Sequence, residues 1–218
     1  MDNSYLLTYL DKRGIPLITQ RHHTYLEYFG YEQQYTYVLR DGVVKTSVIM
    51  KDGREFNIAY LKGPDIISLL RDEVSSYTSA PFNVRIESPE VSFYRIPRVQ
   101  FWDYVNSDAR LQAYVKDYYR ANLVEAIHRQ QMMIMNGKTG AVCALLYMLM
   151  SQFGRRDGDG VLIDFPVSNE DIAGFCGIST RNSVNRILHR LIDDGVIELS
   201  ARRIRVLDSQ YLRRYALD

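Results

Sequence analysis

The sequence has few of the residues that build disulfides, metal sites or membrane spans. It contains two cysteines, Cys143 and Cys176, both in apolar stretches, so neither a disulfide framework nor a metal-binding knuckle is expected. No apolar run of about 18 residues occurs, and the first residues lack the basic start and long apolar stretch of a secretion signal. We therefore expect a cytoplasmic protein without a membrane partner.

An excess of charge of one sign is also absent. The 218 residues carry 27 Lys and Arg against 26 Asp and Glu, a formal net charge of +1, whereas proteins that coat nucleic acids without sequence preference spread basic charge over much of their surface. No nucleophile with a base at usable spacing, paired-carboxylate motif or metal signature is found, so the sequence does not predict an enzyme. Its length allows two modest domains, each with its own core.

The stretch from Ser168 to Ile192 carries the clearest local signals. Ser168 and Asp171 have the spacing of a capping box, which begins a helix, and Gly177 stands where a left-handed residue would end it. A second helix then begins after Ser179 or Thr180. Its apolar residues recur at helical spacing, at Val184, Ile187, Leu188, Leu191 and Ile192.

The opposite side of this second helix carries no carboxylate. It holds Asn182, Asn185, Arg186 and His189, with Arg181 in the first turn. Two short helices joined by a Gly-containing turn predict a helix-turn-helix, whose second helix enters the major groove, where Arg pairs with guanine and Asn with adenine. The alternative is an ordinary helical hairpin with a solvated polar face, which usually mixes Glu and Lys.

A basic hairpin is expected next to this helix. Residues 196–199 and 204–207 have strand character, and residues 200–203 link them as a turn. Residues 180–207 contain six arginines and three acids, so positive charge gathers where phosphates would lie. Before the first helix we expect a buried scaffold helix at 141–153, a flexible loop at 154–160 and a short strand at 161–165; a short helix should close the chain at 208–216.

The residues from Ser168 to Ile197 resemble the winged helix-turn-helix of the Crp/Fnr transcription regulators. The resemblance implies that Arg186, which precedes Ile187 and Leu188, reads a base, followed by Arg181 and Asn182. Six further residues are expected to hold phosphates and set the register on DNA. They are Ser168, Ser179, Ser183, Asn185, Arg202 and Arg203.

The N-terminal half is predicted to be mostly antiparallel strands. Residues 37–39, 43–50, 56–61, 83–87 and 91–96 are rich in β-branched and aromatic residues, and Asp-Gly pairs punctuate the first of them. Residues 4–28 are interpreted as one or two short helices, with Ser4 and Thr24 as caps. Residues 37–67 resemble the β-roll of the cyclic-nucleotide-binding domain, the sensor half of Crp/Fnr regulators.

The resemblance also bears on which effector the β-roll could bind. Where cyclic-AMP-binding members hold the ribose with Gly-Glu, this chain has Ile67, Ser68 and Leu69, and where they hold the phosphate with Arg and Ser or Thr it has Ala80 and Pro81. A buried phosphate would lack a cation there, so cyclic AMP is not expected to bind. No Cys precedes Cys143, which argues against an iron-sulfur cluster. The four histidines, His22, His23, His128 and His189, leave a haem open, and the effector is unknown.

Residues 98–136 give the longest helical pattern. The residues expected to face a second copy of the helix are Leu111, Val115, Tyr118, Asn122, Ala126 and Met133, with the register open by one residue. The alternative is a single helix packed across the β-roll. Residues 136–140 are expected to form a hinge.

Together these patterns predict an α+β protein in three parts. They are an N-terminal antiparallel β-roll at 1–100, a dimerisation helix at 101–136 and a C-terminal winged helix-turn-helix at 137–218. The expected function is that of a transcription regulator which binds an inverted repeat in double-stranded DNA as a homodimer, with half-sites roughly 34 Å apart. RNA polymerase and a small-molecule effector stay open as further partners. The alternative is a ligand-sensing module whose C-terminal domain contacts a protein rather than DNA.

Overall fold

The computed structural model describes residues 3–22, 24–71, 74–75, 78–135, 137–200 and 203–216, without the side chains of 132–135. The chain divides into two compact units between Asn122 and Leu123, and each unit is described by itself. Within the described ranges, no helix combines the length and hydropathy that a membrane span requires.

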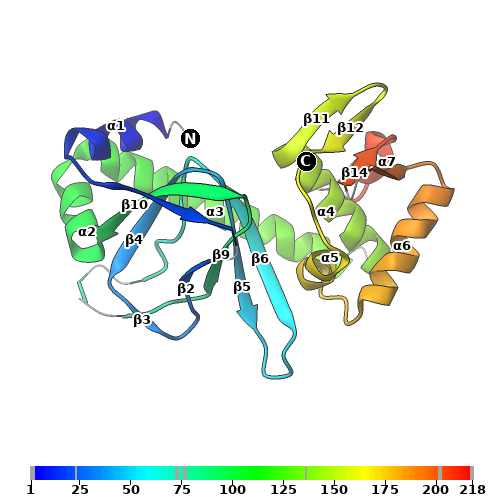
Figure 1. The fold of residues 1–218 in the computed structure, drawn as a ribbon, viewed down its shortest axis with the longest axis horizontal. Coiled ribbons are helices and arrows are strands. Elements are labelled where there is room, and N and C mark those ends of the chain that lie inside the picture. The colour runs from blue at the N-terminus through cyan, green and yellow to red at the C-terminus, as the bar shows by residue number, and fades with distance from the viewer. Residues whose placement is uncertain are drawn as a thin grey trace. The chain divides into compact units, whose positions relative to one another are not determined.

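Three antiparallel sheets make up most of the first unit (Figure 1). One has the order β1 (Leu17–Arg21), β10 (Glu90–Pro97), β4 (Tyr35–Asp41) and β7 (Asp65–Ile66), and a second has the order β2 (Tyr25–Glu27), β9 (Asn83–Ile86), β5 (Val43–Ile49) and β6 (Glu55–Lys62). β3 (Glu32–Gln33) pairs with β8 (Thr78–Ser79). The five predicted strands are confirmed, and β5 and β6 form a long hairpin (Figure 1).

Alternation along β4 and β10 builds two cores, because successive side chains of a strand point to opposite faces. Leu39 and Phe93 are buried with Val84 between the two larger sheets. Val38 and Tyr94 are buried on the other side, in a cluster that includes residues of α1 (Ser4–Lys12), α2 (Arg98–Ser107) and the start of α3 (Ala109–Met135). The roll is therefore covered by helices on one side.

The prediction of helices over residues 4–28 is only half correct. α1 forms as expected, but residues 17–21 and 25–27 are the strands β1 and β2. Leu17 pairs with Tyr94 and Tyr25 with Arg85, so long-range pairing decides the structure here. Thr24 caps no helix; its carbonyl accepts from the Ile86 amide at 2.9 Å.

The predicted long helix is two helices. Asp108 has extended backbone angles (φ −134°, ψ 111°) that separate α2 from α3. Its carboxylate accepts from the amides of Arg110 at 2.9 Å and Leu111 at 3.0 Å, which caps α3. The next helix, α4 (Gly137–Phe153), starts at Gly137 with φ of 59° and so begins earlier than the predicted 141.

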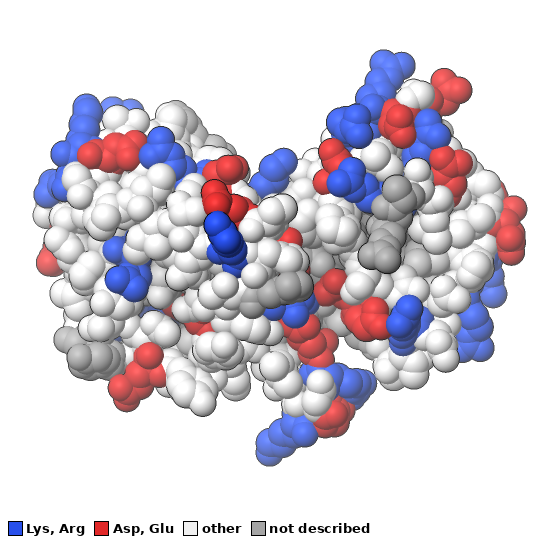
Figure 2. Space-filling view, viewed as in Figure 1, with Lys and Arg blue, Asp and Glu red and all other residues white. Residues whose placement is uncertain are grey.

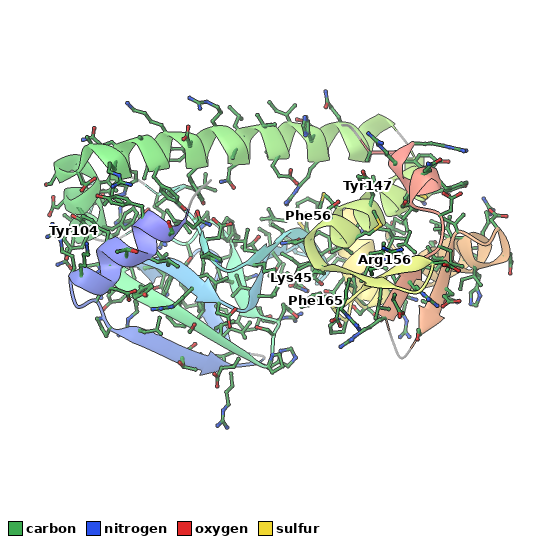
Figure 3. All side chains as sticks on the ribbon, turned by 90° about the horizontal axis from the view of Figure 1, so that it is seen from above. Lys45, Phe56, Tyr104, Tyr147, Arg156 and Phe165 are labelled. Atoms are coloured by element: carbon green, nitrogen blue, oxygen red, sulfur yellow. The ribbon has the colours of Figure 1, made fainter. Side chains whose placement is uncertain are left out.

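The second unit packs helices and a four-stranded sheet. Besides the second half of α3, the helices are α4, α5 (Asn169–Cys176), α6 (Arg181–Asp193) and α7 (Ser209–Arg213). The sheet has the order β11 (Gly154–Asp157), β12 (Gly160–Ile163), β14 (Arg203–Val206) and β13 (Ile197–Ser200). The expected scaffold role of α4 holds: most of it is buried, and Phe153 stacks on Phe165 at 4.5 Å between ring centroids (Phe165 is labelled in Figure 3).

The flexible loop predicted at 154–160 is wrong. Residues 154–157 form β11, which pairs with β12 around a tight turn in which Gly158 has φ of 59°. The two turn residues are Gly158 and Asp159, and glycine at the first of two turn positions is typical of such hairpins. At Gly160, a Cβ atom would lie 2.6 Å from the Val206 carbonyl oxygen, so the close approach of β14 requires glycine there.

Candidate DNA-binding surface

Local hydrogen bonds fix the two helices of the predicted helix-turn-helix. The Asp171 amide donates to Ser168 Oγ at 3.0 Å and the Ser168 amide donates back to the Asp171 carboxylate at 3.3 Å, so the predicted capping box is present. Gly177 ends α5 in the left-handed conformation, with φ of 61°. Thr180 then caps α6 by accepting from the Ser183 amide at 3.3 Å. Figure 1 shows α5 and α6 side by side, joined by this short turn.

The two sides of α6 differ as the sequence predicts. Val184, Leu188 and Leu191 are 0–3% exposed and lie in the core of the unit. The opposite side is exposed and holds Arg181, Asn182, Asn185, Arg186 and His189, together with Arg190. An exposed helix face with donors and acceptors but no carboxylate can approach base edges without charge repulsion from phosphates.

The exposed side chains of α6 make weak contacts within the chain. Arg181 forms an ion pair with Glu170 of α5 at 3.2 Å, and both side chains are more than half exposed. Arg186 donates to Ser183 Oγ at 3.4 Å. Exposed ion pairs of this kind contribute little to stability, so both guanidinium groups are able to exchange these partners for a nucleic acid at small cost.

The six candidate phosphate contacts are in different situations. Ser179 and Asn185 are exposed, while Ser183 is half-buried with its hydroxyl 2.9 Å from that of Thr180. Ser168 uses both its amide and its hydroxyl as donors to Asp171, so it is not retained as a phosphate contact. Arg202 lies outside the described residues.

The basic hairpin forms from β13 and β14, but two of its arginines are committed elsewhere. Arg203 belongs to β14 rather than to the turn, and it forms an ion pair with Asp164. Arg205 donates to Glu198 at 2.8 Å and to the Asp157 carbonyl oxygen at 3.1 Å, which ties this hairpin to β11. The sequence count of basic residues therefore overstates the positive charge available to DNA, while the Arg203 side chain, 40% exposed, stays a predicted phosphate contact.

Charge on the face shown in Figure 2 is mixed. Figure 2 shows Lys and Arg interspersed with Asp and Glu on the face in view. Exposed arginines also occur on β11, among them Arg156 (Figure 3). Sequence reasoning assigned them no role because they were expected in a loop.

Three of the residues predicted to face a second copy of the long helix are buried within one chain. Leu111, Val115 and Tyr118 are 1%, 6% and 5% exposed and belong to the core that covers the β-roll, so this part of the prediction is wrong. Tyr118 also donates to the Ile66 carbonyl oxygen at 3.2 Å. The alternative, a helix packed on the roll, is therefore correct for the first half of α3.

The second half of α3 is different. Asn122 and Ala126 are exposed, and the side chain of Met133 lies outside the described residues. Apolar side chains are exposed beside them. They are Tyr119 at 40%, Leu123 at 63%, Val124 at 46% and Ile127 at 46%.

Most of the residues at the expected effector positions are buried. Ile67 and Leu69 are buried in the two cores of the roll, and Ala80 is 1% exposed. Of the histidines considered as haem ligands, His22 and His189 are exposed and His128 is half-buried, while His23 lies outside the described residues. No cluster of three metal-ligating side chains occurs in the described part of the chain.

These observations define a class: a DNA-binding regulator that combines a β-roll with a winged helix-turn-helix. Residues 140–215 match the family model of the Crp-like helix-turn-helix domain. The chain is 56% identical over 211 residues to the lactate racemization regulatory protein of Lactiplantibacillus plantarum, covering 97% of this chain and 96% of the relative. It is 26% identical over 196 residues to the anaerobic regulatory protein of Bacillus subtilis, covering 88% and 79%.

The chain belongs to the Crp/Fnr family of transcription regulators. Its fold is similar to that of FixK2 from Bradyrhizobium japonicum, with a TM-score of 0.77 at 17% identity over 93% of this chain and 98% of the other. As a member of this family, the protein is a DNA-binding transcription regulator rather than an enzyme, as the sequence predicted.

Proposed function

We propose that this regulator binds an inverted-repeat operator as a homodimer and controls genes of lactate racemization. The gene assignment is supported by 56% identity over nearly the whole length of a relative named for that role. The observation that carries DNA binding is the exposed, acid-free side of α6, held in place by a buried apolar side. The protein acts where the chromosome lies, in the cytoplasm.

Arg186, Arg181 and Asn182 are assigned to base edges. Their side chains are exposed at the start and middle of α6, the part of a recognition helix that enters the major groove. Ser179, Ser183 and Asn185 are assigned to phosphates, because they flank these residues and offer neutral donors. Arg202 and Arg203 stay predictions for the same role.

Dimerisation is assigned to the exposed apolar stripe that runs along α3 from Tyr119 to Ile127. Tyr119, Leu123, Val124 and Ile127 recur at helical spacing, and an apolar stripe of this kind is usually covered by a partner. Replacing Leu123 and Ile127 with Asp should yield monomers in light scattering, because a carboxylate would be buried between the two helices. Ala121→Asp, at an exposed position about 200° around the helix from Leu123, should leave the dimer intact.

Two measurements test the function. DNase footprinting on the operator region of the lactate racemization genes should show two protected half-sites about one helical turn apart, with an affinity that falls steeply with salt. Deleting the gene should change the transcript level of the same operon. Absence of both effects would contradict the proposal, and binding without a change in transcript would contradict the gene assignment alone.

We further propose that cyclic AMP is not the effector. The support is that Ile67, Leu69 and Ala80 are buried apolar residues at the positions where the family's ribose and phosphate contacts are expected. Titration calorimetry with cyclic AMP should give no binding heat. Micromolar binding would overturn this part of the proposal.

A further inference from the structure

A buried ion pair lies inside the β-roll, and its arginine follows Leu69, the last of the positions discussed for the ribose of cyclic AMP, by two residues. Glu27, at the end of β2, is 1% exposed, and Arg71, which follows β7, is 7% exposed. Arg71 Nη2 donates to Glu27 Oε1 at 2.7 Å and to the Tyr35 carbonyl oxygen at 2.9 Å. Burial raises the pKa of Glu27, and the charge of Arg71 and its hydrogen bond act against this rise.

The hydrogen-bonding capacity of this pair is only partly used. Nε and Nη1 of Arg71 and Oε2 of Glu27 are buried and have no hydrogen-bond partner among the described residues. Buried polar atoms are nearly always paired, and a guanidinium group has five N–H donors to satisfy. Another buried cation of the roll, Lys45, differs from Arg71 in that its carboxylate partner reaches solvent. Lys45 is fully buried and donates at 3.0 Å to Glu55, whose side chain is 29% exposed (Lys45 is labelled in Figure 3).

The unused atoms are complementary to a particular kind of ligand. The Nε and Nη1 donors point to different edges of the guanidinium group, and either one suits an oxygen of an anionic carboxylate or a similar acceptor. The unused carboxylate oxygen of Glu27 suits a hydrogen-bond donor on the same ligand. To join β2 to β4, the pair needs only the contact between Nη2 and Oε1 and the contact to the Tyr35 carbonyl. In that case the other three buried polar atoms of the pair would stay without hydrogen bonds, which costs free energy.

Tyr37 lies close enough to Glu27 and Arg71 for their charges to act on its pKa. Tyr37 is 7% exposed and belongs to the core cluster that also contains Ile67 and Phe82. Burial and then the charge of Glu27 raise its pKa to about 12. It therefore stays a neutral phenol and adds no competing charge.

We propose that Arg71 and Glu27 form a binding site within the β-roll for a small carboxylate that carries a hydroxyl or ammonium group on the neighbouring carbon. Arg71 binds the carboxylate, and Glu27 accepts from the hydroxyl or ammonium group. That such a ligand acts as an effector of DNA binding rests on the proposed function. The binding site itself does not.

The test uses the full-length protein without DNA and three probes of matched size. Acetate offers the carboxylate alone, glycolate adds a hydroxyl, and glycine adds an ammonium group. Titration calorimetry and ligand-observed NMR should show that glycolate or glycine binds more tightly than acetate. Arg71→Met should weaken this binding by about tenfold or more, as expected for a hydrogen bond to a charged group.

A second variant tests the role of Glu27. In Glu27→Gln, the amide oxygen is still able to accept the hydrogen bond from Arg71, but an amide nitrogen, which only donates, replaces the unused carboxylate oxygen Oε2. Acetate binding should therefore persist. The preference for glycolate or glycine over acetate should be lost. Arg54→Met, at an exposed arginine, should leave binding unchanged. If circular dichroism shows that Arg71→Met does not fold, the double variant with Glu27→Met removes both buried charges and should also fail to bind.

Three results would overturn the site. They are absence of binding of every probe to the wild-type protein, equal binding of acetate and the two bifunctional probes, or unchanged binding by a folded Arg71→Met protein. A gel shift on the operator without any probe measures DNA binding separately. Failure of the site is thus distinguishable from failure of the proposed function.

Discussion

Replacing Arg186 with alanine removes the side chain assigned most directly to a base, and the structure indicates how selective the effect should be. In the chain itself, Arg186 is exposed and donates to Ser183 at 3.4 Å. Its loss should change the free energy of unfolding by no more than about 0.5 kcal/mol. The thermal midpoint of the variant should therefore match that of the wild type.

On DNA the expected loss is much larger. A bidentate contact between arginine and guanine is worth roughly 1–3 kcal/mol against the wrong base. The proposed dimer makes this contact in each half-site, so specific binding should weaken by roughly 2–6 kcal/mol, which is about 30-fold to 20,000-fold. Binding to random DNA depends mainly on phosphates and should change little.

The assay compares operator and random duplexes of equal length in gel shifts at one salt concentration. Arg190→Ala is the matched control, because Arg190 is also exposed on α6 but lies in its last turn. Arg190→Ala should weaken binding to the operator duplex and to the random duplex by a similar, small factor. Equal losses on the two duplexes for Arg186→Ala, or a larger selective loss for Arg190→Ala, would refute the assignment of Arg186 to a base.

Ser168→Ala should lower the free energy of unfolding by about 1 kcal/mol in a denaturant titration, because it breaks the capping box of α5; an unchanged midpoint would show that the box does not stabilise the unit. Burial raises the pKa of Cys143 and of Cys176 to about 12, so both thiols should react slowly with a thiol reagent at about pH 8 until the protein is unfolded; rapid reaction of the folded protein would contradict this. Burial raises the pKa of Asp65 from 3.8 to about 6, so the folded state binds the proton of this carboxyl group more tightly than the unfolded state does. The free energy of unfolding should therefore fall by up to about 3 kcal/mol as the pH rises from about 4 to about 6. Asp65→Asn should flatten this part of the plot of unfolding free energy against pH, and an unaltered plot would contradict the assignment of the pH dependence to Asp65.

Local signals predicted the helix-turn-helix well because each one is complete within a few residues. Ser168 and Asp171 cap each other, Gly177 takes the left-handed conformation, and Thr180 begins the next helix. The turns of the β-roll were equally local, with Gly42 and Gly53 at positive φ between neighbouring strands. Such features need no knowledge of distant partners.

The errors concern residues whose structure depends on distant partners. Residues 17–21 became a strand by pairing with residues 90–94, and this pairing leaves no mark in the local pattern. The register of α3 failed because both of its sides are apolar: one side, with Leu111, lies in the core, while the other, with Leu123, is exposed. Periodicity alone does not tell which apolar side faces its own domain.

The pair of Arg71 and Glu27 was not predicted from the sequence, because it too depends on residues far apart in the chain. The two residues are 44 positions apart, and neither stands in a recognisable motif. Arg205 was counted as a DNA-binding charge because its contacts with Glu198 and the Asp157 carbonyl appear only when the two hairpins pair. In both cases a charged residue was judged by its type, whereas its role depends on its neighbours in space.

The separation of the two sides of α6 has a consequence for how operator preference can change. Val184, Leu188 and Leu191 hold the helix in the unit, whereas Asn182 and Arg186 take no part in that core. Exchanging the outer residues should therefore redirect the regulator to a different operator while the domain keeps its stability, because exposed substitutions rarely change stability by more than about 0.5 kcal/mol. One scaffold is thus able to serve a series of promoters that differ only in the bases facing this helix.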